Sequence, residues 1–527
     1  MMLRTYSATA LLLTAAILPL LGCGHAGPVS SLPPAGAIAA GDQGAEEGLG
    51  PGMGGDQYVR IVENPFVSVH SDPLSTFSID VDTASYAKTR EFLLEHGQLP
   101  PPDAVRIEEF INYFRYDYAE PTDEHPFAVH VEVAGCPWRE EHRVARIALQ
   151  GKRFDKGQRP AANLVFLLDV SGSMGAADKL PLVIDGMRML VRQLDAADRV
   201  AIVVYAGAAG LVLDSTSGDR KQEILDAVLR LQAGGSTNGG EGIRLAYRVA
   251  QENLIEDGVN RLILCTDGDF NVGTTSTGAL VRLAEQQAQS GVFLSVLGFG
   301  TGNLNDALLE ELSNRANGNY AFVDTVAEAR KVLVDQAGGT LVTIAKDVKL
   351  QVEFNPTRVE AWRLIGYENR ILDHQDFDND SKDAGEIGAG HSVTALYEII
   401  PAGVSTAASV AGAGALKYQS RSVPSDAAAS GELLTVELRY KQPDAEQSTH
   451  MEVAVTDGAT SFSGASIDLQ HAVAVALFGM LLRGSDHHGE GTYDTVLEIA
   501  ARTKQQDQQG YRAEFVAMVE EARRLVR

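Results

Sequence analysis

Hydrophobic and polar positions follow a repeating order between residues 161 and 338 of this chain. Short apolar runs at Leu164–Leu168, Val200–Tyr205 and Arg261–Thr266 alternate with segments whose apolar residues recur at helical spacing, as from Leu180 to Leu194. Continuous apolar runs indicate strands that are buried on both faces, and the amphipathic helices between them cover those faces. The pattern predicts an α/β domain with a doubly wound, mostly parallel sheet.

Segments with a different pattern lie on either side of this domain. Residues 57–150 contain a helix that begins at Asp82 or Thr83 and ends at His96, followed by alternating strands such as Phe127–Ala134, so we expect an α+β unit. Residues 339–527 begin with strands and end with three helices, which predicts a β-plus-helical unit. The last helix places one set of apolar side chains on a single face: Phe515, Met518, Val519, Ala522, Leu525 and Val526.

The N-terminus has the pattern of an export signal. Arg4 precedes an apolar run from Ala8 to Gly22, which is too short to span a membrane comfortably. The sequence Leu20-Leu21-Gly22-Cys23 resembles the lipobox of bacterial lipoprotein signals. That resemblance implies a signal peptide over residues 1–22, cleavage before Cys23 and lipidation of its thiol, with plain secretion as the alternative. Gly24 implies the outer membrane if the host is Gram-negative.

Two further segments bear on how the chain meets a membrane. Residues 23–56 are rich in Gly, Ala, Pro and Ser, which predicts a flexible tether. The other long apolar stretch, Ala472–Leu482, is shorter than a membrane span and predicts a buried helix instead. We therefore expect a protein that is anchored to a membrane by lipid and does not cross it.

Composition narrows the function classes. The 527 residues suggest about three domains. The net charge of −26 repels phosphate backbones and argues against nucleic-acid binding. Three cysteines without a CxxC pair exclude a disulfide framework and a structural zinc site. Cys265 lies in a predicted buried strand, and a bond between it and Cys136 is not expected because it would close a very long loop onto that strand.

Three predicted strand-end loops carry oxygen ligands. Asp169-Val170-Ser171-Gly172-Ser173 follows the first strand of the α/β domain and offers one carboxylate and two hydroxyl groups. Gly234–Gly239 contains Thr237, and Cys265–Gly268 contains Asp267. Loops at the carboxyl ends of parallel strands meet in one crevice, and oxygen ligands suit a hard divalent cation. We expect a metal site here, with water and one open position completing an octahedron.

These motifs make the chain similar to a known family. Asp-x-Ser-x-Ser after the first strand, a Thr in a Gly-rich loop and Thr-Asp-Gly after a later strand resemble the von Willebrand factor type A domain. More narrowly, the chain resembles bacterial lipoproteins in which that domain lies between two flanking segments. The flanking resemblance rests on Phe77–Tyr86 on the N-terminal side and Ala389–Glu398 on the C-terminal side.

The resemblance implies a metal-ion-dependent adhesion site. Ser171, Ser173 and Thr237 would bind Mg²⁺ directly, with Mn²⁺ or Ca²⁺ as alternatives, and Asp169 and Asp267 would act directly or through water. The open position would accept a carboxylate from an Asp or Glu of a partner protein. The implied function is an envelope-anchored protein-binding module without enzymatic activity. A metal-dependent hydrolase and a scaffold with a purely structural metal are the alternatives.

Other motifs favour less specific interpretations. Ser171–Gly175 is a near match to the G-x-S-x-G elbow of hydrolases, but Ser stands where the first Gly is needed. Gly298–Asn303 resembles part of a dinucleotide-binding loop and is better interpreted as a strand-to-helix turn. Asp376–Asp380 begins like a calcium-binding EF-hand loop but lacks its Gly and Glu, which favours a solvated acidic loop over weak Ca²⁺ binding. The adjacent pair His487-His488 is expected in a surface loop.

Overall fold

The computed structural model describes residues 56–154, 159–236, 239–268, 277–300, 304–336, 342–382, 384–404, 410–411, 424–443, 445–504, 507 and 509–527. The predicted signal peptide, the tether up to residue 55, Cys23 and Thr237 therefore lie outside the described residues.

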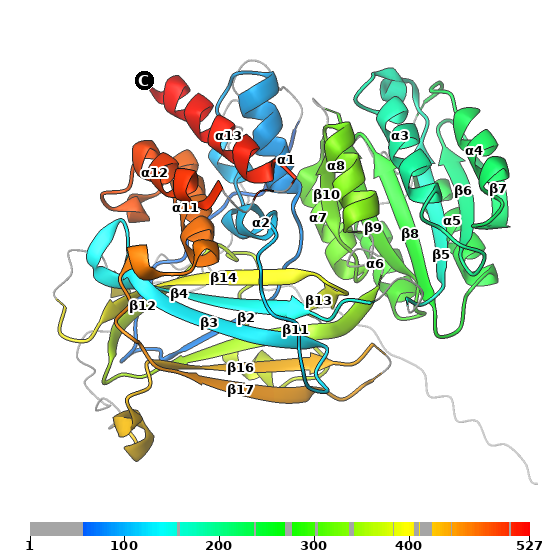
Figure 1. Cartoon of the computed structure of the whole chain (residues 1–527). Coiled ribbons are helices and arrows are strands. Elements are labelled where there is room, and N and C mark those ends of the chain that lie inside the picture. Colours follow the sequence, from blue (N-terminus) through cyan, green and yellow to red (C-terminus); the bar gives the residue numbers. More distant parts are fainter. Residues whose placement is uncertain are drawn as a thin grey trace, which may run out of the picture. The chain divides into compact units, whose positions relative to one another are not determined.

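Residues 162–336, the central domain, contain a six-stranded sheet (Figure 1). All neighbouring strands are parallel except β7, which pairs antiparallel with β6 at one edge. In spatial order the strands are β10 (Tyr320–Val323), β9 (Phe293–Phe299), β8 (Val259–Thr266), β5 (Ala162–Asp169), β6 (Arg199–Tyr205) and β7 (Ala209–Ser217). This arrangement confirms the predicted α/β fold class.

Helices cover both faces of this sheet. Every side chain of β5 is therefore buried, on one face or on the other. Val165 and Leu167 share a core with α5 (Gly239–Glu252), α6 (Thr277–Ala288) and α7 (Asp306–Arg315). Leu164, Phe166 and Leu168 face the other core. The helices on that side are α3 (Leu180–Val191), α4 (Lys221–Leu229) and α8 (Val326–Arg330) with its π-helical extension η4 (Lys331–Asp335).

The segments before and after the central domain form one joint structure, which we call the flanking body. One of its sheets has the order β15 (Val410–Ala411), β1 (Phe66–Ser68), β12 (Val359–Ile365), β14 (Ser392–Pro401), β4 (Arg139–Gly151) and β3 (Phe127–Cys136). The other has β13 (Gly385–Gly388), β11 (Thr343–Phe354), β16 (Leu434–Lys441) and β17 (Thr449–Val455), with β2 (Leu74–Ser78) also paired to β11. The segments expected at 57–150 and 339–527 thus share both sheets, and the central domain is an insertion between them.

Helices pack on the outer face of the β14–β4 sheet (Figure 1). They are α1 (Ala84–Arg90) with its π-helical extension η1 (Glu91–Glu95), α2 (Ile107–Asn112), α11 (Ile467–Arg483), α12 (Tyr493–Thr503) and α13 (Tyr511–Val526). Shorter turns are η2 (Pro102–Ala104), η3 (Gly172–Gly175), α10 (His374–Phe377), η5 (Asp426–Ser430), η6 (Phe462–Gly464) and η7 (Asp486–His488).

The apolar helix predicted from Ala472 is the centre of this layer. It belongs to α11, and its side chains from Ala472 to Met480 are buried among the neighbouring helices and the sheet. Of the face predicted for the last helix, Val526 is exposed because it lies at the end of α13, beyond the contacts that bury Phe515 and Ala522. No helix in the described part of the chain is long and apolar enough to cross a membrane.

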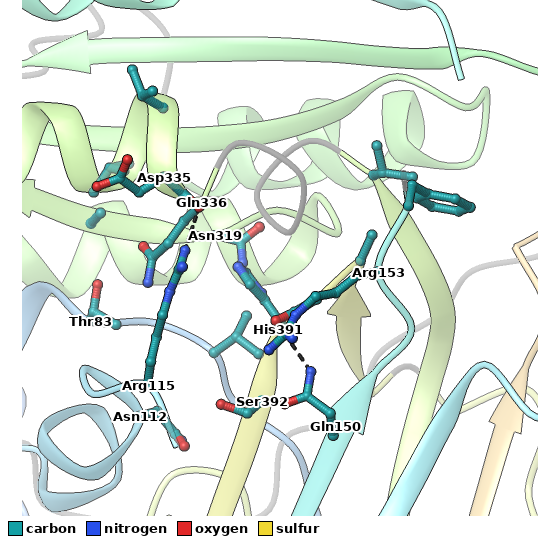
Figure 2. A pocket seen from close by; sticks show the side chains of 18 of the residues that line it. Thr83, Asn112, Arg115, Gln150, Arg153, Asn319, Asp335, Gln336, His391 and Ser392 are labelled. Carbon is teal, nitrogen blue, oxygen red and sulfur yellow. Dashed lines mark hydrogen bonds between the residues drawn. The ribbon is translucent and has the colours of Figure 1, made fainter. Parts of the chain in front are cut away.

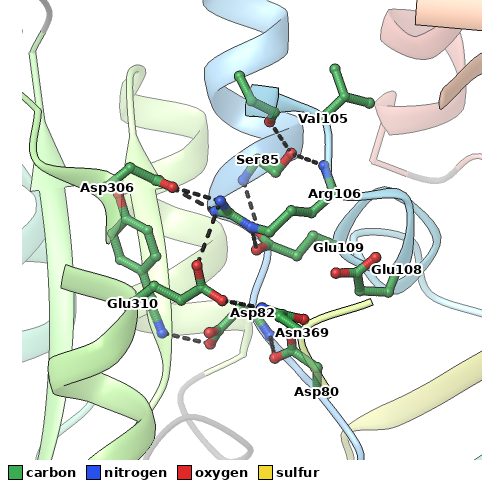
Figure 3. A network of polar contacts seen from close by, with 12 residues as sticks. Asp80, Asp82, Ser85, Val105, Arg106, Glu108, Glu109, Asp306, Glu310 and Asn369 are labelled. Atoms are coloured by element: carbon green, nitrogen blue, oxygen red, sulfur yellow. Dashed lines mark hydrogen bonds and ion pairs between the residues drawn. The ribbon is translucent and has the colours of Figure 1, made fainter. Parts of the chain in front are cut away.

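Buried charges join the central domain to the flanking body (Figure 3). Arg106, just before α2, pairs with Asp306 of α7 across 2.5 Å and also with Glu109. Arg370, in the loop after β12, lies 3.1 Å from Asp80. The carboxylates gathered around these two guanidinium groups are Asp80, Asp82, Glu108, Glu109, Asp306 and Glu310. The interface therefore buries more carboxylates than arginines.

This excess of negative charge raises the pKa of several carboxyl groups. Burial raises the pKa of Glu108 to about 7, and the nearby Glu368 adds to the shift. Burial likewise raises the pKa of Glu109 to about 8, against the opposing effect of Arg106. Part of the cluster is therefore protonated in the folded protein near pH 7.

We predict that this cluster makes stability fall as pH rises. The unfolded Glu108 carboxyl titrates near pH ~4.3, so between that pH and about 7 the folded protein keeps a proton that the unfolded chain has lost. Glu108→Gln removes this titration and can keep the hydrogen bond that Glu108 accepts from the Tyr367 amide (3.0 Å). In thermal unfolding, Tm of the variant minus Tm of the wild type should grow from about pH 5 to 7 and level off by about pH 8.

The matched control is Glu223→Gln, an exposed glutamate on α4. The Tm of Glu223→Gln minus the Tm of the wild type should stay constant over the same pH range. A constant difference for Glu108→Gln as well would contradict the prediction.

Candidate metal centre

The three predicted ligand loops meet at one edge of the central sheet. Strand β5 ends at Asp169, and its parallel neighbours β6 and β8 end beside it, with Asp169 opposite Tyr205 and Leu168 opposite Cys265. Backbone hydrogen bonds join two of the loops, from Gly172 N to Gly235 O (3.1 Å) and from Gly234 N to Val170 O (2.7 Å). The loop geometry is therefore fixed by the sheet register and by main-chain contacts.

Asp169 organises the first loop. Its Oδ1 accepts a hydrogen bond from the Ser171 amide at 2.8 Å, and the hydroxyl groups of Ser171 and Ser173 lie 3.0 Å apart. Asp169 and Ser171 are buried, whereas Ser173 is exposed. Burial raises the pKa of Asp169, Asp267 adds to the shift, and hydrogen bonds from Ser171 and Tyr205 oppose it. The loop thus gathers three oxygen-bearing side chains between the core and the surface.

Asp267 lies in the loop after β8 and is paired with a lysine that the sequence analysis did not identify. The Nζ atom of Lys179 lies 2.9 Å from Asp267 Oδ2. Asp267 Oδ1 is buried and makes no hydrogen bond to any described residue. Lys179 packs against Gly300, whose φ is +70° and where a Cβ would lie 2.2 Å from Lys179 Cε. Gly300, in the motif Gly298–Asn303, therefore makes room for the lysine stem.

A local signal in the sequence could have indicated Lys179. It precedes the first turn of α3, where the helix dipole disfavours a cation. A lysine at that position is expected to have a carboxylate partner nearby, but the sequence alone does not say which carboxylate.

The described part of the site fits a hard divalent cation. It combines two carboxylates and two hydroxyl groups, which are the ligands that Mg²⁺ prefers. Asp169 and Asp267 are both buried, and Lys179 is paired with Asp267, whereas no ion pair to Asp169 is formed by the described residues. The third predicted hydroxyl ligand, Thr237, lies outside the described residues.

The hydrolase interpretation of the same loop finds no support in the geometry. Gly172–Gly175 forms the 3₁₀ turn η3, and the hydroxyl groups of Ser171 and Ser173 are hydrogen-bonded to each other. Within the described residues, no histidine is hydrogen-bonded to Ser171 or Ser173.

The loop that resembles an EF-hand is held by protein cations. Lys349 Nζ donates to the carbonyl oxygens of Asp376 (3.1 Å) and Asn379 (2.5 Å), and Lys441 Nζ donates to that of Asp380 (2.6 Å). These ammonium groups therefore hold three main-chain carbonyl oxygens of the loop. His487-His488 forms η7, where the ring of His487 packs edge-on against Phe66. Cys136 and Cys265 are buried free thiols.

Comparison with known proteins matches three consecutive parts of the chain. Residues 163–336 match the von Willebrand factor type A domain, residues 53–146 match a family model described as von Willebrand factor, and residues 339–525 match the C-terminal region of the uncharacterized protein YfbK. The uncharacterized protein YfbK of Escherichia coli is 40% identical over 471 residues, which cover 88% of this chain and 80% of YfbK.

Two more distant relatives match mainly one part of the chain. Inter-alpha-trypsin inhibitor heavy chain H2 of Mus musculus is 27% identical over 32% of this chain and 19% of its own length. The E3 ubiquitin-protein ligase WAV3 of Arabidopsis thaliana is 26% identical over 40% of this chain and 26% of its own length. A von Willebrand factor type A structure from Catenulispora acidiphila covers 77% of this chain and 92% of its own, with 14% identity and a TM-score of 0.40.

We predict that Lys179 stabilises the metal-free protein by compensating Asp267. Lys179→Met would leave the buried Asp267 carboxylate without its paired cation and should lower the free energy of unfolding by about 2–3 kcal/mol in metal-free buffer. Denaturant unfolding measures the change, with the exposed Lys504→Met as a control that should stay within about 0.5 kcal/mol of the wild type. Equal stability of the two variants would show that the ion pair contributes nothing.

Proposed function

Because this chain belongs to the YfbK family of von Willebrand factor type A domain proteins, we propose that it is a protein-binding module of the cell envelope that uses a divalent cation. The cation, Mg²⁺ before Mn²⁺ or Ca²⁺, would be held by Asp169, Ser171, Ser173, Thr237 and Asp267. When bound, it would supply a positive charge with one coordination position open to an Asp or Glu side chain of a partner protein.

One observation carries the metal proposal. Two carboxylates, Asp169 and Asp267, are buried near each other, and within the described residues Lys179 pairs with Asp267 and no cation pairs with Asp169. Burying an uncompensated carboxylate is costly, and a divalent cation that takes oxygen ligands from both would remove that cost. The unpartnered Oδ1 of Asp267 supports this assignment, since it is a buried acceptor that lacks a donor among the described residues.

The surface of the site supports binding over catalysis. Ser173 is exposed while Asp169 and Asp267 lie beneath the surface, so a partner carboxylate would reach the cation from solvent. A metal-dependent hydrolase would also need a general base beside the cation. Lys179 is already engaged with Asp267, and we therefore propose that the protein binds partners and is not an enzyme.

A second candidate function rests on the same lysine. Lys179 compensates Asp267 without any metal, which favours a scaffold in which a metal is only structural or weakly bound. Under both candidates we propose that Cys23 is lipidated and attaches the protein to the membrane, with the outer membrane as the site if the host is Gram-negative.

We predict that Asp169→Ala abolishes metal binding. Removing a charged ligand from a buried site should weaken Mg²⁺ by about 100-fold or more, measured by titration calorimetry on the chain from residue 57 onward. Asp185→Ala, an exposed aspartate on α3, is the matched control and should bind like the wild type.

Lys179→Met adds an internal test of the site. With the competing ammonium group removed, Mg²⁺ should bind about tenfold more tightly or better, since like charges close together repel. Saturable binding that Asp169→Ala leaves intact would place the metal elsewhere and contradict the proposal.

We further predict that partner capture depends on the metal. Cross-linked complexes of the wild-type protein should be recovered in Mg²⁺ and lost in EDTA, and Asp169→Ala should recover none in either buffer, whereas Asp185→Ala should behave like the wild type. Complexes that persist in EDTA and in Asp169→Ala would favour the scaffold.

A further inference from the structure

A polar cavity, distinct from the candidate metal centre, lies between the central domain and the flanking body (Figure 2). Its volume is about 480 Å³, within the ~300–1,000 Å³ typical of small-molecule sites. Asn319, before β10, and Gln336, after η4, line it from the central domain. Arg115, after α2, Gln150 of β4 and His391, before β14, line it from the flanking body.

Arg115 enters the cavity with its charge uncompensated. Its guanidinium group donates to the backbone carbonyl of Asp335, and no carboxylate of the described residues lies within 4 Å of it. The other arginines of the lining are already paired, Arg153 with Glu120 and Arg159 with Asp198. Arg115 therefore keeps a planar set of donors available for a ligand.

Two uncharged groups add donors on the side facing Arg115. His391 Nδ1 is buried and has no hydrogen-bond partner in the described structure. Burial, with Arg115 and Arg261 as further causes, lowers the pKa of His391 to about 4, so the ring is neutral at pH 7 and can donate from Nδ1. Asn319 Oδ1 accepts a hydrogen bond from Arg261 (3.4 Å). The side-chain NH₂ group of Asn319 has no hydrogen-bond partner among the described residues and can donate to a ligand.

The acidic residues of the lining do not cancel this arrangement. Asp335 lies 3.8 Å from Arg330, and Asp195 lies 3.5 Å from Arg159, so each has its own arginine. Among the described lining residues, Arg115 has no carboxylate partner, and His391 and Asn319 add two neutral donors. Such a set recognises an anion, because a guanidinium fork matches two oxygen atoms of a carboxylate or phosphate.

We propose that this cavity binds a small oxyanion, a phosphate or carboxylate compound, held by Arg115 with hydrogen bonds from His391 and Asn319. The site is separate from the candidate metal centre. Asn319 and Arg159 precede strands of the central sheet, whereas Asp169 and Asp267 follow strands. None of the candidate metal ligands among the described residues lines the cavity, and Arg115, His391 and Asn319 are not among those ligands.

Because the cavity lies between the central domain and the flanking body, a ligand bound in it would stabilise the docking of the two. An oxyanion there contacts the central domain through Asn319 and the flanking body through Arg115 and His391. A ligand that binds the docked arrangement and not the separated domains stabilises docking by RT ln(1 + L/Kd), where L is the concentration of free ligand. Ligand binding should therefore raise Tm as well as release heat.

The test uses inorganic phosphate and citrate as probes, titrated into metal-free protein at constant ionic strength in chloride. We expect saturable binding of at least one probe with one site per chain, weakened about tenfold or more in Arg115→Gln. Arg220→Gln, an exposed arginine on the central domain away from the cavity, should bind like the wild type. The tighter of the two probes identifies the oxyanion class.

Two further variants separate this site from the metal centre and from loss of folding. Asp169→Ala should keep the probe affinity of the wild type, so failure of the metal proposal does not affect this one. Arg115→Lys keeps the charge and loses the fork, and it should also weaken binding if Arg115→Gln does not fold. Absence of saturable binding of both probes, or equal affinity in the wild type and the Arg115 variants, would overturn the proposal.

Discussion

Buried arginines hold the central domain against the flanking body, and the rest of the architecture depends on them. Arg106 binds Asp306 of the central domain, and Arg90 of α1 binds Asp324 and Glu328, which lie after β10. A buried guanidinium group that loses its carboxylate leaves an uncompensated charge, so these pairs permit one docking arrangement and penalise others. The constraint matters because the central domain is an insertion, with its two ends entering different sheets of the flanking body at β4 and β11.

That docking affects the two candidate sites differently. The carboxyl edge of the central sheet carries Asp169 and Asp267, with Ser173 open to solvent above them. The cavity that we propose for an oxyanion is lined by residues of both the central domain and the flanking body, among them Asn319, Arg115 and His391. Docking of the two parts therefore forms this cavity, whereas the candidate metal centre is built from loops of the central domain alone.

Charges of one sign are in excess in three polar regions: the interface cluster, the candidate metal centre and the cavity. The interface cluster has too many carboxylates and keeps protons on Glu108 and Glu109, whose pKa values are raised to about 7 and 8. The candidate metal centre also has an excess of carboxylate, in which Lys179 compensates Asp267 and a divalent cation could compensate the rest. The cavity has the opposite imbalance at Arg115. A different species would relieve each imbalance: a proton at the interface cluster, a divalent cation at the candidate metal centre and an anion at Arg115.

The sequence by itself determined the α/β class, the strands and helices of the central domain and the candidate ligands Asp169, Ser171, Ser173 and Asp267. These follow from periodicity and from residues close together in the chain, because a strand and the loop after it are local features. The metal-ligand roles of these four residues remain predictions, as do the role of Thr237 as a ligand and that of Cys23 as the lipidation site. Only the tertiary structure decided that residues 57–150 and 339–527 share two sheets, that Lys179 faces Asp267, and that Arg115 meets His391. Those contacts join residues from 88 to about 340 positions apart, and no local pattern specifies which distant strand or charge will be the partner, since that choice depends on packing the whole chain at once.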